Sequence, residues 1–268
     1  MWLRNLRQAA NINVTSRPEI SRPNFHICAV QLYDSKQHKE QLEMANAIQS
    51  PQTKLTVLIS GNGSNLQALI DACKNSSLPA TTIVRVISNR KDAFGLKRAE
   101  KGSIATAYHN LVSYKKKHPA TDEGVTAARS EYDRDLASLV LADKPDMVVC
   151  AGWMHILAPT FLEPLEKAGV PVINLHPALP RQFNGAHAID RAYAAFQEGK
   201  IEHTGIMIHY VISEVDMGQP ILTRNIEIKK DDTLDQLEER IHANEWELIV
   251  QGTKEASQNL HSSQKAAA

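Results

Sequence analysis

The chain has 268 residues and carries 30 Lys and Arg against 30 Asp and Glu, so its formal net charge is zero. This balance argues against nucleic acid or an anionic membrane as a partner, and no apolar run approaches the roughly 20 residues that span a bilayer. The three cysteines lack the paired spacing of a zinc site or a disulfide framework, and no two histidines have the i, i+4 spacing of a zinc-binding helix. We therefore expect a soluble protein of a reducing, cytoplasmic compartment that holds no metal.

Residues 1–53 differ from the rest of the chain, because they are polar and show no sustained periodicity. Residues 1–22 hold four arginines and one acidic residue. Three explanations stay open: an organellar targeting segment, a disordered tail, or an over-extended gene model, since Met44 lies just ahead of the globular part. We expect a domain at 54–258, with this disordered or targeting extension before it and a flexible tail, 259–268, after it.

Strand-like and helix-like segments alternate over most of the domain, which predicts an α/β fold with a mostly parallel twisted sheet flanked by helices. The predicted strands are 55–60, 83–88, 104–107, 147–151 and 172–175. The predicted helices are 65–74, 94–101, 125–142 and 188–196. Later the order changes, because 206–211 and 221–228 predict an antiparallel strand pair and 233–252 a long final helix.

A glycine-rich turn follows the first predicted strand and precedes a helix. It consists of Gly61, Asn62, Gly63, Ser64 and Asn65. Backbone N–H groups at such a turn, together with the helix dipole, favour a bound phosphate. The turn matches neither the dinucleotide fingerprint nor a P-loop, so a whole nucleotide is disfavoured. The alternative is a tight turn that merely needs glycine.

Two polar groups stand next to predicted strand ends. Asn174 and His176 are two residues apart, so a strand would direct both to one face. An amide and an imidazole aimed at one point suit chemistry in which a carbonyl oxygen gains charge while protons move. Asp216 falls in a loop before Gly218, where its carboxylate would orient an imidazole or a water. The alternative in both cases is a hydrogen-bonded turn.

Glu245 interrupts the apolar stripe of the last predicted helix, between Ile241 and Leu248. An unpaired carboxylate that faces a core is costly. Either the end of this helix leaves the core, or Glu245 meets a cationic or amine partner in a cleft.

Together these segments resemble phosphoribosylglycinamide formyltransferase, a folate-dependent enzyme family of purine synthesis, over residues 54–255. The matching motifs are the strand and glycine loop at 57–67, the folate-pocket segment at 151–157, Asn-x-His-Pro at 174–177 and Asp-x-Gly at 216–218. The long segment 115–126 is similar to fungal members. Many members carry an arginine where His155 stands.

The resemblance implies transfer of the formyl group of 10-formyltetrahydrofolate to the amine of glycinamide ribonucleotide, in de novo IMP synthesis, without a metal. The implied catalytic residues are Asn174, His176 and Asp216. The implied substrate-binding residues are Gly61, Asn62, Gly63, Ser64, Asn65 and Glu245. The implied folate-binding residues are Arg129, Met154, His155, Ile156, Leu157, Val211, Glu214 and Val215. The expected partners are small molecules only, and the expected state is a monomer or weak homodimer.

Three rival functions share parts of this pattern. A formyltetrahydrofolate hydrolase would carry a regulatory domain before the core, and a methionyl-tRNA formyltransferase would carry a basic domain after it. A non-catalytic anion-binding scaffold on the same fold would not need all the polar groups named above. A formyl-transfer assay beside a hydrolysis control separates these functions.

Overall fold

A computed structural model describes residues 52–267 of the chain. The predicted extension 1–53 falls outside the described residues except for Gln52 and Thr53, and Thr53 begins the first strand. None of the helices in 52–267 combines the length and the apolar character of a membrane span.

The described residues form a seven-stranded sheet in the order β3-β2-β1-β4-β5-β6-β7. Five strands run parallel: β1 (Thr53–Ile59), β2 (Thr81–Ser88), β3 (Ala105–Tyr108), β4 (Met147–Cys150) and β5 (Val172–His176). The last two are antiparallel to their neighbours: β6 (His203–Tyr210) and β7 (Pro220–Glu227). The predicted fold class is confirmed. Because β1, β4 and β5 are adjacent and parallel, their carboxyl ends meet at one edge, beside the point where the strand order reverses.

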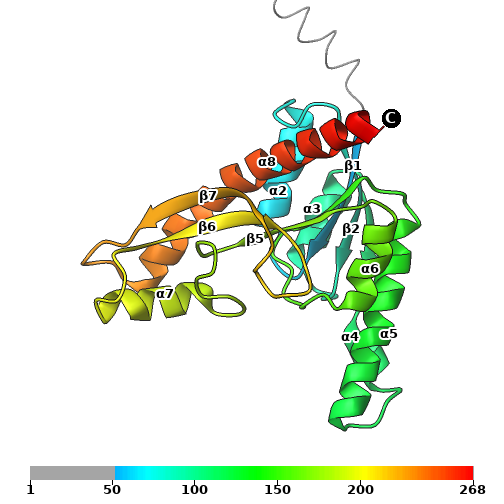
Figure 1. Cartoon of the computed structure of the whole chain (residues 1–268), viewed down its shortest axis with the longest axis horizontal. Coiled ribbons are helices and arrows are strands. Elements are labelled where there is room, and N and C mark those ends of the chain that lie inside the picture. Colours follow the sequence, from blue (N-terminus) through cyan, green and yellow to red (C-terminus); the bar gives the residue numbers. More distant parts are fainter. Residues whose placement is uncertain (1–51, 268) are drawn as a thin grey trace, which may run out of the picture. The chain divides into compact units, whose positions relative to one another are not determined.

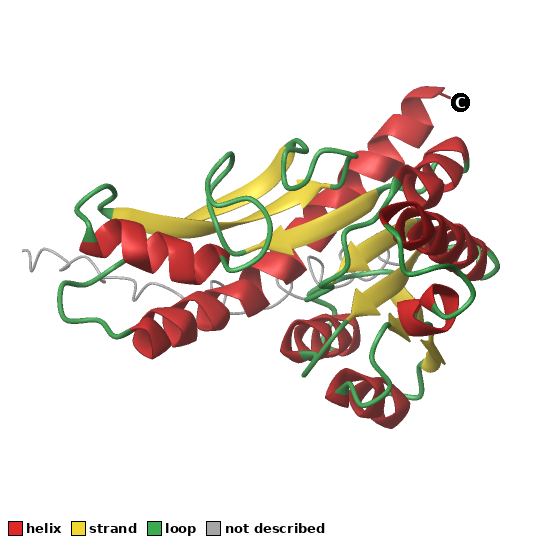
Figure 2. Ribbon diagram, turned by 90° about the horizontal axis from the view of Figure 1, so that it is seen from below, coloured by secondary structure: helices red, strands yellow, loops and turns green. Residues whose placement is uncertain are grey.

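Helices cover both faces of the sheet (Figure 1, Figure 2). One face carries α2 (Ser64–Lys74), α3 (Phe94–Lys101), α7 (Ala188–Gln197) and α8 (Leu234–Ala267). The other carries α4 (Leu111–Lys115), α5 (Asp122–Leu141) and α6 (Pro159–Lys167), which Figure 1 shows together beside β1 and β2. Successive residues of β1 divide between the two buried clusters, since Val57 and Ile59 pack under α2 and Leu58 packs under α5. Burial on both faces explains why the central strands are apolar throughout.

Two short helices did not follow from the sequence. Five-residue α4 is too short for a periodic signal, although the side chain of Asn110 caps it by accepting from the N–H of Ser113 at 3.2 Å. In α6, Pro159 occupies the first turn and Pro164 lies inside the helix. Proline inside a helical pattern normally predicts its end, so the sequence pattern concealed this helix.

The predicted end of the last helix at Gly252 was wrong. A Cβ at Gly252 would lie 2.6 Å from Ile208, so glycine here lets α8 approach β6 closely and does not terminate the helix. The helix continues to Ala267, through most of the segment predicted as a tail. In that part His261 Nε2 lies 2.8 Å from Thr53 Oγ1, at the start of β1.

Candidate active site

The end of β5 carries the predicted amide and imidazole. Asn174 pairs in register with His209 of β6, and its Nδ2 lies 3.3 Å from His209 Nε2. His176, two residues further on, is buried with 4% of its surface exposed. The strand thus brings both side chains to one buried polar group, which Asp216 completes.

Asp216 connects the two histidines. Its Oδ2 lies 3.4 Å from His176 Nδ1, and its Oδ1 lies 3.5 Å from His209 Nε2. The backbone N–H of Gly185 donates to Oδ2 at 2.7 Å. The loop after β6 can fold back this far because Gly218 lacks a side chain, since a Cβ there would lie 1.7 Å from the last carbonyl oxygen of β6.

The environment separates the charge states of these groups. Burial lowers the pKa of His176, and His209 adds to this effect, while the Asp216 carboxylate acts in the opposite direction. Burial would raise the pKa of Asp216, but the neighbouring His209 and the hydrogen bond from the N–H of Gly185 hold that pKa below its usual value. Asp216 is therefore ionised at neutral pH, and its charge opposes the effect of burial on the pKa of His176. The buried Nε2 of His176 has no hydrogen-bond partner within 52–267, so this atom is free to meet a ligand.

His209 is a site residue that the sequence did not single out. It is 1% exposed, and its Nδ1 donates to the carbonyl oxygen of Tyr210 at 2.9 Å, so Nε2 of the neutral ring accepts from Asn174 Nδ2 at 3.3 Å and lies 3.5 Å from Asp216 Oδ1. Sequence reasoning considered the histidines only together, through the spacing of a zinc site. Its proximity to Asn174 depends on the antiparallel register of β5 and β6, which leaves no spacing signal along the chain.

The glycine-rich turn lies between β1 and α2. Gly63 has φ +75°, and a Cβ there would lie 2.6 Å from Gly95 Cα, so the turn requires glycine. A Cβ at Gly61 would meet nothing within 4 Å, so its backbone faces open space. Because α2 begins without a side-chain cap, the N–H groups of its first turn remain available to an anion. Of the two interpretations that the sequence left open, the tight turn that needs glycine applies to Gly63, and the anion-binding turn fits the open backbone at Gly61.

Helix α3 holds this turn from the side. The N–H of Gly95 donates to Gly61 O at 3.1 Å, and Arg98 donates to both the backbone and side-chain oxygens of Asn62 at 2.9 and 2.8 Å. Arg98 therefore places a positive charge beside the turn. Sequence reasoning missed this residue, because it lies on the next helix in an ordinary charged stretch.

Glu245 meets the turn from α8. Its Oε2 accepts from Asn65 Nδ2 at 3.0 Å, and both side chains are buried, with 6% and 7% exposed. Burial raises the pKa of Glu245, and the hydrogen bond from Asn65 opposes that rise. The helix therefore stays in the core, which excludes the first alternative for this carboxylate. Its partner in the chain is an amide and not a cation, and Asn65 Oδ1 has no partner within 52–267.

Two segments present exposed apolar side chains near the sheet edge. Met154 and Ile156, after β4, are 83% and 53% exposed, and Val215, after β6, is 36% exposed. At the bases of these segments Leu157 and Val211 pack in the same buried cluster, which brings the segments together. Exposed apolar groups on both sides suit a flat aromatic ligand.

Three more of the predicted folate-binding residues differ in exposure and in their contacts. His155 is buried against Asp133, with Nε2 2.8 Å from Oδ1, so it presents its backbone and not its imidazole to a ligand. Arg129 is half-buried on α5 and donates to Ile156 O at 3.4 Å, which places it beside the same segment. Glu214 is exposed on the loop after β6.

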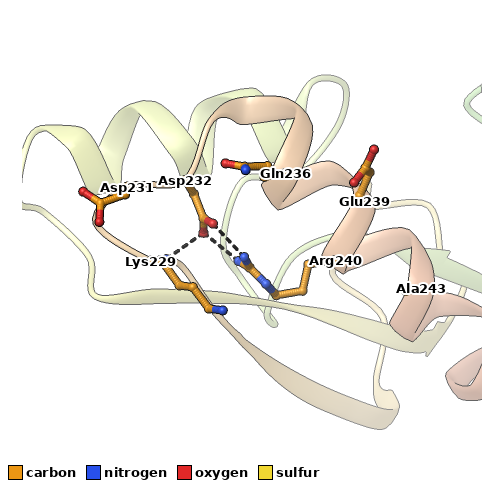
Figure 3. Close-up of a pocket in the computed structure, with 7 residues that line it drawn as sticks. All are labelled: Lys229, Asp231, Asp232, Gln236, Glu239, Arg240 and Ala243. Atoms are coloured by element: carbon orange, nitrogen blue, oxygen red, sulfur yellow. Dashed lines mark hydrogen bonds and ion pairs between the residues drawn. The ribbon is translucent and has the colours of Figure 1, made fainter.

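A separate hollow of about 640 Å³ lies at the start of α8 (Figure 3). In it Arg240 donates to both oxygens of Asp232 at 2.6 Å, and the N–H of Lys229 donates to the same carboxylate at 2.7 Å. The charged groups of Asp232 and Arg240 are paired with each other, so the hollow is lined by a structural ion pair that holds the start of α8. No group of three metal-binding side chains occurs within 52–267.

An Asn–His–Asp group lies at a strand end, beside a turn with free N–H groups and at the switch point of a mostly parallel sheet, and this arrangement suits the class of enzymes that transfer a group at a carbonyl carbon. Residues 53–253 match the family described as Formyl transferase, and the chain belongs to that family. Its relatives include the phosphoribosylglycinamide formyltransferase of Schizosaccharomyces pombe, 51% identical over 198 residues, which cover 74% of this chain and 93% of the relative. The enzyme of that name from Saccharomyces cerevisiae is 47% identical over 213 residues, 78% of this chain and 99% of the relative.

Solved structures agree with the sequence relatives. Glycinamide ribonucleotide transformylase 1 from Symbiobacterium toebii is 28% identical with a TM-score of 0.66, covering 78% of this chain and 89% of that one. Phosphoribosylglycinamide formyltransferase from Campylobacter jejuni is 32% identical with a TM-score of 0.63, covering 76% and 97%. The resemblance drawn from the sequence motifs is thereby confirmed, whereas the roles of individual site residues stay predictions.

Proposed function

We propose that this chain transfers the formyl group of 10-formyltetrahydrofolate to the amine of glycinamide ribonucleotide, a step of de novo purine synthesis. The observation that carries the proposal is the buried contact of Asp216 with His176, beside Asn174 and next to the glycine-rich turn. The names of the fungal relatives support formyl transfer to the same acceptor.

In the first step the substrate amine attacks the formyl carbon, so a new C–N bond forms and the formyl oxygen gains negative charge. The amide of Asn174 and, in the protonated form of His176, its Nε2–H are the donors that meet this oxygen. A preorganised donor of this kind lowers the barrier by roughly 3–4 kcal/mol. Burial lowers the pKa of His176, while the Asp216 carboxylate at 3.4 Å favours the protonated form that this role requires.

In the second step the bond between the formyl carbon and the folate nitrogen breaks. The attacking amine must lose a proton and the departing nitrogen must gain one. The ionised Asp216 holds His176 in one orientation and orders the water that relays this proton. Atoms and charges then balance, with no group of the protein consumed.

The two substrates occupy different parts of the site. The phosphate of glycinamide ribonucleotide lies on the turn 61–65, and the glycinamide end meets Glu245, so that attack becomes effectively intramolecular. The folate ring lies against the exposed apolar side chains of Met154, Ile156 and Val215, on the segments that also hold 155, 157, 211 and 214. Arg129 borders this pocket and is placed to pair with the folate carboxylate tail.

The test measures formyl transfer by Asn174→Ala, His176→Ala and Asp216→Ala proteins, with and without glycinamide ribonucleotide. We expect each variant to lose at least about a hundredfold in kcat. His203→Ala is the matched control, because His203 is exposed at the start of β6. Near wild-type transfer by all three variants would refute the assignment. Hydrolysis of the folate without transfer would favour the hydrolase.

We infer further that the protein works in the cytoplasm on small molecules alone, as a monomer or weak homodimer. Residues 1–53 leave organellar targeting open. Mass analysis of the native N-terminus with cell fractionation tests the location, and light scattering across a dilution series tests the oligomeric state.

A further inference from the structure

The segment 181–187, between β5 and α7, surrounds the catalytic pair with backbone groups. The N–H of Gly185 donates to Asp216 at 2.7 Å. The carbonyl groups of Phe183 and Gln182 act on the imidazole of His176 and favour its protonated form. The charges that act on His176 are those of Asp216 and His209, from the loop after β6 and from β6 itself. The segment therefore supplies a donor to the carboxylate, and carbonyl dipoles that favour the protonated imidazole.

The backbone of this segment is strained. Arg181, Phe183 and His187 have φ of 65°, 49° and 55°, in the left-handed region that side chains disfavour. Such residues are destabilising and persist only where surrounding contacts enforce them. Since three of them occur within seven residues, something outside the segment must hold it.

Arg191, in the first half of α7, makes those contacts. Its Nη2 donates to Phe183 O and to Asn184 O at 2.5 and 2.7 Å, and its Nε donates to His187 O at 3.3 Å. Its guanidinium also lies 6.0 Å from the centre of the Phe183 ring. A guanidinium presents its donors in a rigid planar fork, which a lysine cannot reproduce.

We propose that Arg191 is a positioning residue, which holds the segment 181–187 so that the N–H of Gly185 stays on Asp216 and the carbonyl of Phe183 stays beside His176. Arg191 touches neither catalytic side chain and acts only through these two backbone groups. The proposal rests on the proposed function for its kinetic readout, but not for its spectroscopic one.

Removal of the guanidinium has a defined direction. Without the N–H of Gly185, the pKa of Asp216 rises, and without the carbonyl of Phe183 the pKa of His176 falls. The pH range in which Asp216 is charged while His176 can hold a proton therefore narrows from both sides. A purely structural role would lower stability and leave this range unchanged.

The experiment compares Arg191→Gln and Arg191→Lys with wild-type full-length chain. The control is Arg134→Gln, at an exposed arginine of α5. We measure kcat against pH, the thermal midpoint, and the NMR titration of the His176 ring, assigned with a His176→Asn protein. We expect about a tenfold loss of kcat in Arg191→Gln, a narrower pH profile and a lower His176 pKa, with a smaller change in Arg191→Lys.

Unchanged pH profile and His176 titration in both variants would overturn the proposal, whatever happens to kcat. If Arg191→Gln does not fold, Arg191→Lys decides the question by the same two measurements. If the wild-type protein shows no formyl transfer, the proposed function fails, yet the His176 titration still tests Arg191.

Discussion

Replacement of Asp216 by asparagine removes one negative charge from the proposed catalytic group and keeps the shape of the side chain. The amide oxygen can still accept the N–H of Gly185, which now lies 2.7 Å from Oδ2. The two imidazoles at 3.4 and 3.5 Å lose their carboxylate. Any kinetic change therefore reports the charge and not a displaced loop.

The size of the effect follows from the distance between the charges. At 3.4 Å and an effective dielectric constant of about 20, a unit charge pair is worth about 5 kcal/mol. Because one carboxylate serves both His176 and His209 and its side chain is 10% exposed, we expect about half of this, roughly 2–3 kcal/mol, to be lost in the transition state. That corresponds to about a hundredfold lower kcat.

The assay follows formyl transfer to glycinamide ribonucleotide under saturating folate across pH. Asp216 opposes the lowering of the His176 pKa, so Asp216→Asn should also shift the alkaline loss of activity to lower pH. Asp231→Asn is the control, since Asp231 is an exposed carboxylate in the separate hollow at the start of α8. A kcat within about threefold of wild type, with an unshifted profile, would show that the carboxylate charge does not assist catalysis.

Three further predictions concern binding and stability. Gly61→Ala should keep the melting temperature and raise the KM for glycinamide ribonucleotide, whereas Gly63→Ala should lower the unfolding free energy by roughly 1–3 kcal/mol. If the two variants changed the melting temperature and the KM equally, this distinction between the two glycines would be wrong. Glu245→Gln should raise that KM about tenfold. Burial raises the folded-state pKa of Glu245, so its charge lowers the stability of the fold above that pKa and has no effect well below the unfolded value of 4.5. The unfolding free energy of Glu245→Gln should therefore exceed that of wild type at pH 7 but not at low pH. The hydrogen bond from Arg240 lowers the pKa of Asp232 from 3.8 to about 2. The contribution of this ion pair to the unfolding free energy is therefore present above pH 3.8 and lost as pH falls through about 2. Urea titrations of Asp232→Asn should no longer show this loss in acid.

Most of the fold could be predicted because its signals are local. Apolar runs, an apolar helical stripe and a glycine turn lie within a few residues of one another, so alternation and periodicity identified the central strands and the helix after the first strand. Prediction failed where a tertiary contact overrode the local signal. Gly252 has the appearance of a helix end, but it serves the close packing of α8 on β6. Pro164 has the appearance of a break, but it lies within α6.

The sequence by itself determined that Asn174 and His176 share a strand end and that a glycine turn suits an anion, because those relations span two to five residues. Only the tertiary structure decided which other residues join the Asn174–His176 pair and the glycine turn. It brought Glu245 to Asn65 from 180 positions away, set His209 against Asn174 through strand register, and placed the Arg191 guanidinium on the segment beside the catalytic pair. Contacts between distant positions depend on how elements pack, and packing leaves no fixed spacing along the chain.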